Sequence, residues 1–197
     1  MLKVGITGGI GSGKTTVCKM FELLNVPVYF SDIRSKELIQ SDQDLIEAIK
    51  SEFGNQIYDR QNSLDRVALA AIVFKDEQKL KKLNSIVHPA VAMDFMKWCA
   101  NFSNEKYVIK ESALLFETEA GIDLDFIITV YADPETRLKR IQDRDKSDAS
   151  DVLLRMKNQL PDTNKMSRSD YVIFNDGKQS LIKQVLALHN ELSNDLI

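Results

Sequence analysis

The sequence contains few cysteines and few histidines. Among its 197 residues there are two of each, Cys18 and Cys99 with His88 and His189, and the cysteines form no C-x-x-C pair. These four residues lack the spacing of a zinc site, and two cysteines are too few for a disulfide framework. We therefore expect two reduced thiols in a reducing compartment, and a cytoplasmic protein.

Long hydrophobic runs are also missing. No segment approaches the roughly 18 consecutive apolar residues of a membrane-spanning helix, and the apolar N-terminus runs into glycines before it could form a signal peptide. Glycine and proline number only 8 and 4, which excludes collagen-like and low-complexity chains. A net charge of −3 argues against a general binder of nucleic acids or anionic membranes. We expect neither as a partner, although a small anionic ligand would respond to local charge.

The sequence does contain an alternation of strand and helix patterns. Short apolar runs predict strands at 2–7, 26–30, 107–111, 126–131 and 171–174. Helical patterns predict helices at 14–24, 32–40, 134–143, around 153–156, and at 178–194. Strands separated by helical crossovers indicate an α/β fold, a five-stranded parallel sheet with helices on both faces.

Two segments look like insertions on this core. Residues 41–102 show helical patterns without a convincing strand, and residues 137–168 form a charged block. We interpret both as parts of a single domain spanning residues 1–197. Helices within the first segment are expected at 41–53, capped by Ser41 and ended by Gly54, and at 65–74, 78–87 and 89–102, with Pro89 in the first turn.

Residues 8–15 read Gly-Gly-Ile-Gly-Ser-Gly-Lys-Thr and match G-x-x-x-x-G-K-[ST] at every position. An expected strand precedes the motif and an expected helix follows it, which is the context of a phosphate-binding loop. In such a loop the backbone N–H groups surround the β-phosphate of a nucleoside triphosphate, the lysine contacts the β- and γ-phosphates, and the first threonine binds Mg²⁺. The predicted ATP-binding residues are Gly11, Ser12, Gly13, Lys14, Thr15 and Thr16.

Two carboxylates follow neighbouring strands. Glu111 ends the expected strand at 107–111 and could help Thr15 to hold Mg²⁺; the alternative is an ordinary solvated glutamate after an edge strand. Asp32 follows the expected strand at 26–30, at the sheet edge where α/β folds bind ligands. There it could accept the proton of an attacking hydroxyl or cap the next helix.

A basic block lies in the second half of the chain. Between positions 137 and 168 there are nine Lys and Arg against five Asp, so this segment carries +4 and the remainder −7. Arg137, Arg140 and Arg144 are spaced by three and four residues and share one helical face. Arginine forks suit the oxygens of a triphosphate; the alternative is a solvated face with nearby aspartates as partners. A flexible segment after these arginines would act as a lid.

Three further segments stand out: Leu-Asn-Ser-Ile-Val-His-Pro at 83–89, Leu-Leu-Phe-Glu at 114–117, and Arg-Ile-Gln-Asp-Arg-Asp at 140–145. Gln159, Lys165 and the segment 170–177 follow them in order. Together with the loop, these segments resemble the motifs of dephospho-coenzyme A kinases, in order and spacing, over nearly the whole chain. The first two are fairly specific for that family, whereas the loop alone is shared by many.

The resemblance implies a P-loop kinase that transfers the γ-phosphate of ATP, with Mg²⁺, to the ribose 3′-hydroxyl of dephospho-coenzyme A. It implies that Asp32 is the general base and that Arg140 and Arg144 cover the transferred group. It further implies that the 41–102 block, with His88, holds the acceptor. The chain departs from the family where Phe30 replaces a first aspartate, where Glu111 replaces an aspartate, and where Arg137 replaces a common glutamine.

Two other functions remain open on the sequence. The loop is compatible with another small-metabolite or nucleoside monophosphate kinase, which a panel of acceptors would distinguish. A nucleotide-dependent switch protein is the alternative of another class. Guanine-specific switches normally carry N-K-x-D, and the segment at 164–167 lacks its aspartate.

Overall fold

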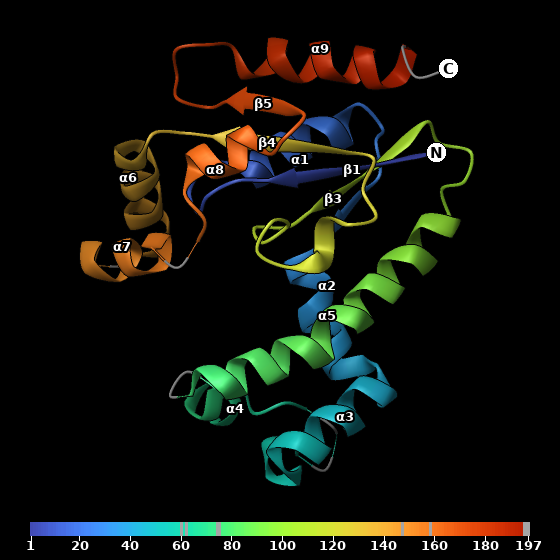
Figure 1. The fold of residues 1–197 in the computed structure, drawn as a ribbon, viewed down its shortest axis with the longest axis vertical. Coiled ribbons are helices and arrows are strands. Elements are labelled where there is room, and N and C mark those ends of the chain that lie inside the picture. The colour runs from blue at the N-terminus through green and yellow to red at the C-terminus, as the bar shows by residue number, and fades with distance from the viewer. Residues whose placement is uncertain (60, 62, 74–75, 147, 158, 195–197) are drawn as a thin grey trace. The chain divides into compact units, whose positions relative to one another are not determined.

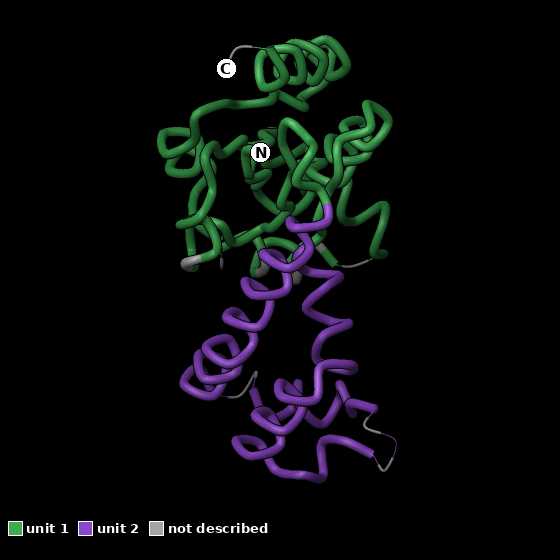
Figure 2. The backbone as a smooth tube through the Cα atoms, turned by 90° about the vertical axis from the view of Figure 1, so that its right-hand side faces the viewer, with its two compact units in different colours: residues 1–30, 102–197 green, residues 31–101 purple. Residues whose placement is uncertain are grey.

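The computed structural model describes residues 1–59, 61, 63–73, 76–146, 148–157 and 159–194. The chain folds as two units, one formed by residues 1–30 with 102–197 and the other by residues 31–101 (Figure 2). The five strands lie in the first unit, and the second unit is built mainly from helices. This helical unit contains nearly all of the 41–102 segment and, in addition, the helix before it.

The first unit is built on a parallel sheet (Figure 1). Its strands are β1 (Leu2–Thr7), β2 (Val28–Phe30), β3 (Tyr107–Glu111), β4 (Phe126–Tyr131) and β5 (Tyr171–Phe174). They are ordered β2-β3-β1-β4-β5, and every pairing is parallel. The prediction of a five-stranded parallel sheet is therefore confirmed. Because the carboxyl ends of parallel strands meet at one edge, the residues after β1 and β3 are brought together there.

The two faces of this sheet are covered differently. Helices α1 (Lys14–Leu23) and α9 (Leu181–Asn194) pack on the face that carries Val4 and Ile6, which are fully buried. On the opposite face, a Cβ at Gly5 would lie 2.6 Å from Leu124 and 2.7 Å from Leu115. The connection from β3 to β4 therefore packs directly on the backbone of β1, which explains a glycine in the central strand.

Three helices follow in the charged block, namely α6 (Pro134–Asp145), α7 (Ala149–Lys157) and α8 (Asp162–Ser167). Asp133 caps α6 by accepting hydrogen bonds from the Thr136 amide at 2.9 Å and the Thr136 hydroxyl at 2.7 Å. These bonds favour the ionised form and lower the pKa of the Asp133 carboxyl. Helix α8 was not expected, since six residues are too few to show a helical period.

The helical unit consists of α2 (Ser31–Ser41), α3 (Gln43–Phe53), α4 (Arg66–Val73) and α5 (Glu77–Ala100), with a short 3₁₀ turn, η1 (Asn55–Ile57). The expectation that Ser41 caps the second helix is wrong: Ser41 ends α2, and Asp42 accepts the Leu45 amide at 3.0 Å. Gly54 ends α3 as expected. The expected helix at 65–74 is observed as α4, and Phe74 lies outside the described residues.

Helix α5 corrects a second expectation. Two helices were expected, with Pro89 in the first turn of the second, but one helix of 24 residues runs through Pro89. An interior proline costs a helix about 3 kcal/mol. Here the buried residues Val87, Val91, Phe95 and Cys99 repeat every four positions on both sides of it, and their packing stabilises the continuous helix. Neither α5 nor any other helix within the described ranges is long and apolar enough to cross a membrane.

Candidate active site

The phosphate loop connects β1 to α1 and comprises residues 8–13. Gly8 and Gly11 have φ angles of 146° and 81°, which residues with a side chain rarely adopt. A Cβ at Gly8 would also collide with the Val130 carbonyl oxygen, and one at Gly11 would lie 2.7 Å from the Arg137 carbonyl oxygen. The loop is thus pressed against β4 and α6, and only glycine is compatible with its path.

Helix α1 begins directly at the end of this loop, with Lys14. Its N-cap, Gly13, provides no side-chain hydrogen bond, and its first turn contains no acidic residue. The N–H groups of the first turn, together with the helix dipole, favour an anion at this end. The Lys14 ammonium donates to the Gly8 carbonyl at 3.1 Å, so its charge lies across the mouth of the loop. The exposed side chains of Thr15 and Thr16 follow on the same turn.

Glu111 ends β3 beside this loop. In the register of β1 and β3 it pairs with Ile6, one residue before β1 ends. Its side chain is buried, and β3 lies between β2 and β1, so the alternative of a solvated glutamate on an edge strand is wrong. Burial chiefly, and then the charge of Glu111, raise the pKa of the Cys18 thiol, while the charge of Lys14 lowers it. Glu111 and Lys14 therefore both act on the same buried residue of α1.

The three arginines of α6 have different partners. Arg140 donates to the Asn175 carbonyl at 2.9 Å and lies 3.5 Å from the Ser12 carbonyl oxygen, so its guanidinium is held beside the loop. Arg144 is largely exposed and pairs with Asp145 at 2.6 Å; these hydrogen bonds raise its pKa. Its role in ATP binding stays a prediction.

Arg137 packs against the phosphate loop at Gly9. Its side chain is 6% exposed and forms an ion pair with Asp162, the first residue of α8. A Cβ added to Gly9 would collide with its guanidinium. Arg137 thus packs against the loop backbone and pairs with Asp162. This differs from the expectation that its charge faces a ligand together with Arg140 and Arg144.

The segment from Gln159 to Lys165 connects the loop to the rest of the unit. The Gln159 side-chain oxygen accepts the Ile10 amide at 2.8 Å. Glu117 accepts the Leu160 amide at 3.0 Å and pairs at 2.7 Å with Lys165, which is fully buried. We noted these motif positions in the sequence without assigning them a contact, because their partners are far away along the chain.

Asn175, within the 170–177 motif segment, makes a further contact that the sequence analysis did not assign. Its side-chain amide donates to the Ser12 carbonyl at 2.8 Å, and its own carbonyl accepts Arg140. Asn175 follows β5 directly, on the opposite side of β4 from β1. A polar residue at the carboxyl end of a strand was the available signal.

The predicted acceptor residues lie in the helical unit. Asp32 is exposed in the first turn of α2, directly after β2. His88 is half-buried in the middle of α5. Helices α2 and α5 pack together, and Arg34 on α2 makes a two-pronged contact with Asp94 on α5, at 3.0 and 2.8 Å. This pair raises the pKa of Arg34 and fixes the two helices that carry Asp32 and His88.

Comparison with known proteins identifies the family. The family model described as dephospho-CoA kinase matches residues 2–180. A dephospho-CoA kinase of Chlorobaculum tepidum is 42% identical over 183 residues, covering 89% of this chain and 87% of the relative. One from Leptospira interrogans is 37% identical over 195 residues, covering 98% and 94%. A Thermus thermophilus protein of known crystal structure superposes with a TM-score of 0.84 at 31% identity, over 98% of each chain. The chain belongs to the dephospho-CoA kinase family.

Proposed function

We propose how this chain performs the reaction of its family, in which the γ-phosphate of ATP is transferred to the ribose 3′-hydroxyl of dephospho-coenzyme A. Coenzyme A and ADP are the products. The observation that carries the proposal is a phosphate loop with Lys14 and Arg140 beside it, in a chain that matches this family over nearly its whole length.

The first unit binds ATP. The loop amides of Gly11, Ser12 and Gly13 and the first turn of α1 surround the β-phosphate, and Lys14 spans the β- and γ-phosphates. Thr16 reaches a neighbouring phosphate. Arg140 stabilises the negative charge that develops on the transferred group, because its guanidinium is already held by Asn175 beside the loop.

Thr15 and Glu111 would hold Mg²⁺. A hydroxyl and a carboxylate are the hard oxygen ligands that this ion prefers, and Mg²⁺ usually takes few protein ligands and completes its shell with phosphates and water. The described part of the chain contains no group of three His, Cys, Asp or Glu able to hold a metal, which fits such a shared site. When bound, the ion neutralises charge on the β- and γ-phosphates.

The helical unit binds the acceptor. Asp32 accepts the proton of the ribose 3′-hydroxyl while the 3′-oxygen attacks the γ-phosphorus. The bond from that phosphorus to the β–γ bridging oxygen breaks, and ADP leaves. The exposure of Asp32 at a helix start leaves its carboxylate accessible to a substrate. His88, on the partner helix α5, contacts the acceptor. Arg144 would bind the transferred phosphate if the 137–168 region closes as a lid. Its guanidinium would then have to leave Asp145 and pair with the phosphate instead.

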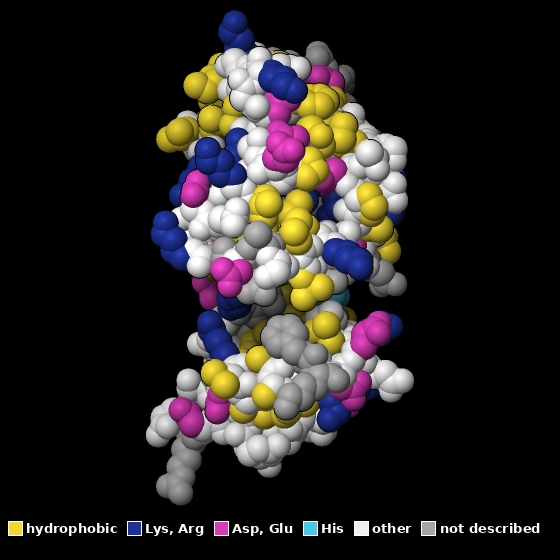
Figure 3. Space-filling view, turned by 90° about the vertical axis from the view of Figure 1, so that its left-hand side faces the viewer, with side chains coloured by type: hydrophobic (Ala, Val, Ile, Leu, Met, Phe, Trp, Pro, Cys, Tyr) yellow, Lys and Arg dark blue, Asp and Glu magenta, His cyan; other side chains and the backbone are white. Residues whose placement is uncertain are grey.

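We further propose that the protein acts in the cytoplasm and that nucleic acid is not one of its binding partners. Both cysteines are buried and free, as expected for a reducing compartment. On the face shown in Figure 3, Lys and Arg side chains are interspersed with acidic and apolar ones, rather than gathered into the basic stripe of a nucleic-acid binder.

A panel of acceptors tests the proposal. With ATP and Mg²⁺, the protein should phosphorylate dephospho-coenzyme A and should turn over AMP, CMP and shikimate far more slowly. The 3′-deoxy analogue of dephospho-coenzyme A should not be phosphorylated, which checks the position of attack. Preference for one of the other acceptors would instead support another small-metabolite or nucleoside monophosphate kinase.

A further inference from the structure

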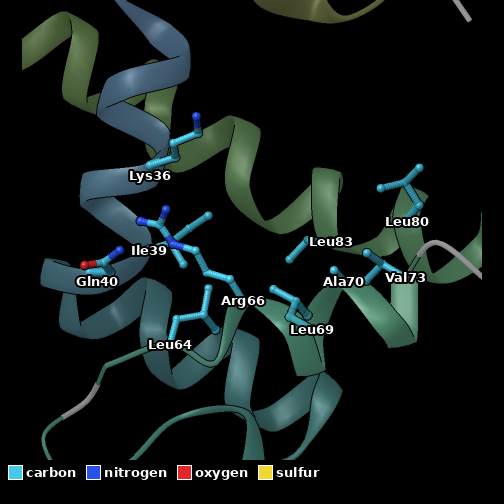
Figure 4. Close-up of a pocket in the computed structure, with 10 residues that line it drawn as sticks. All are labelled: Lys36, Ile39, Gln40, Leu64, Arg66, Leu69, Ala70, Val73, Leu80 and Leu83. Atoms are coloured by element: carbon cyan, nitrogen blue, oxygen red, sulfur yellow. The ribbon is translucent and has the colours of Figure 1, made fainter. Parts of the chain in front are cut away.

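The helical unit contains a cavity of about 250 Å³, lined by residues of α2, α4 and α5, which belongs to the part of the chain that we propose binds the acceptor (Figure 4). In the first unit, a separate set of polar side chains leads from the interior to the phosphate loop. Its members are Gln159, Glu117 and Lys165. The reaction described above gives none of them a chemical step, yet their contacts end at the loop that binds ATP.

Gln159 makes the contact with the loop. Its side-chain oxygen accepts the Ile10 amide at 2.8 Å, although the two residues are 149 positions apart. Ile10 lies between Gly9 and Gly11, and glycines leave the neighbouring peptide units free to rotate. The bond fixes the direction of one N–H group at this point of the loop. It therefore also restricts the directions of the adjacent amides.

A buried charge pair holds the backbone next to Gln159. Glu117 accepts the amide of Leu160, the following residue, at 3.0 Å. The same carboxylate oxygen pairs at 2.7 Å with Lys165, which is fully buried and also donates to the Ala113 carbonyl at 2.9 Å. These contacts form one path from the interior of the unit to the loop, namely Lys165, Glu117, the Leu160 amide, Gln159 and the Ile10 amide.

The charges along this path are compatible with an anion at the loop. Gln159 is neutral, so it holds an amide of the loop without placing a negative charge beside the phosphates, as a carboxylate would. The carboxylate of the path, Glu117, contacts the residue after Gln159 rather than the loop, and a buried ammonium neutralises it. The path therefore holds the loop without repelling a triphosphate.

We propose that Gln159 is a positioning residue for ATP. Through the Ile10 amide it holds the phosphate loop in its binding conformation before the nucleotide arrives, and Glu117 with Lys165 holds Gln159 in place. A loop that is already ordered loses less conformational entropy when ATP binds. The inference rests on the proposed function and deepens it, because it extends the ATP site to side chains that act through the loop.

Gln159→Met keeps the length of the side chain and removes the accepting oxygen. Because one hydrogen bond to the loop is lost, the Kd for ATP, measured by calorimetry, and the KM for ATP should both rise about five- to tenfold. The kcat and the KM for dephospho-coenzyme A should stay nearly unchanged, since the bond is present in both the ground state and the transition state. A residue that only stabilised the fold would lower the unfolding temperature and leave these ATP constants unchanged.

Gln56→Met is the matched control. Gln56 also bonds a backbone group through its side chain, the Phe53 carbonyl at 3.1 Å, but it lies in the helical unit. Its replacement should leave the Kd and the KM for ATP at the unmodified values. If Gln159→Met does not fold, Gln159→Ala removes the same acceptor and should change the ATP constants in the same direction.

Two double variants test the path behind Gln159. Both contain Lys165→Met, one combined with Glu117→Gln and the other with Glu117→Met, so that neither leaves a buried charge unpaired. Glutamine keeps an oxygen that can accept the Leu160 amide, whereas methionine does not. The variant with Glu117→Met should therefore bind ATP several-fold more weakly than the other. Adding Gln159→Met to it should cause little further loss, because both changes act through the same bond.

The outcomes separate this inference from the function on which it rests. If the unmodified protein does not phosphorylate dephospho-coenzyme A, the proposed function is wrong, while calorimetry with ATP still measures the role of Gln159. If it does, but Gln159→Met and Gln56→Met bind ATP with equal affinity, the function stands and Gln159 does not position the loop. Equal Kd values in the two double variants would show that Glu117 does not act through Gln159.

Discussion

Lys14 is the first residue of α1, and its ammonium group already lies across the loop through its bond to the Gly8 carbonyl. We predict that Lys14→Ala lowers kcat by at least about a hundredfold, equivalent to about 2.7 kcal/mol of barrier, because the phosphates lose a charge that follows them into the transition state. Steady-state kinetics measures the effect. Lys19→Ala, an exposed lysine on the same helix, is the control. Near-normal turnover in a folded Lys14→Ala variant would refute this role.

Asp32 is a second residue whose role can be isolated by a small change. Asp32→Asn keeps the shape of the side chain and removes its capacity to take a proton, so we expect kcat to fall strongly while ATP affinity stays nearly unchanged. Asp44→Asn, also exposed in the first turn of a helix of the same unit, is the control and should have normal kinetics. A collapse of ATP affinity instead would assign Asp32 to the metal site or to the fold.

The turn into α8 acts at the scale of an element. Gln159, Asp162 and Lys165 bind the phosphate loop, α6 and the β3–β4 connection respectively, within seven residues of chain. These three contacts position the loop and are made to protein groups, not to a substrate. The conformation of the loop therefore depends on distant residues as well as on its own glycines.

Asp162→Asn should destabilise the protein by about 3 kcal/mol, because it leaves the buried Arg137 charge without its counter-ion. Urea unfolding measures this change. The matched control is Asp145→Asn, which breaks the pair with the largely exposed Arg144 and should cost no more than about 1 kcal/mol. Equal losses in the two variants would show that the Arg137–Asp162 pair does not support the loop.

At the scale of the whole molecule, the two units divide the substrates between them in our proposal. Hydrogen exchange should then show that ATP with Mg²⁺ slows amide exchange in the loop and in α1, while dephospho-coenzyme A slows it in α2 and α5. In Lys14→Ala the protection by ATP should weaken and the protection by the acceptor should remain. Protection by the acceptor confined to the first unit would contradict this division.

The parts of the fold that depend on neighbouring residues could be predicted from the sequence. The five strands and the phosphate loop follow from short apolar runs and from eight consecutive residues, and the parallel sheet is confirmed. Errors arose where two local signals compete. Ser41 and Asp42 are both good N-caps, and Pro89 normally starts or breaks a helix, yet the apolar repeat on both sides of it prevails.

Pairings between distant residues could not be predicted. Gln159 and Ile10 are 149 positions apart, and Arg137 and Asp162 are 25 apart. Helical spacing placed Arg137, Arg140 and Arg144 on one face, but spacing carries no information about what lies opposite that face. Here an aspartate of α8, a carbonyl after β5 and an adjacent aspartate each take one guanidinium.

The sequence by itself determined the chemistry of the loop, because its glycines, Lys14 and Thr15 act through a backbone path that they specify locally. It also carried the motifs by which the family is known. Only the tertiary structure decided which charged side chains are exposed and which are buried in ion pairs within the fold. Burial and ion pairing depend on side chains brought together from far along the chain, and those contacts bury Arg137 in its pair with Asp162 while Arg144 stays largely exposed beside Asp145.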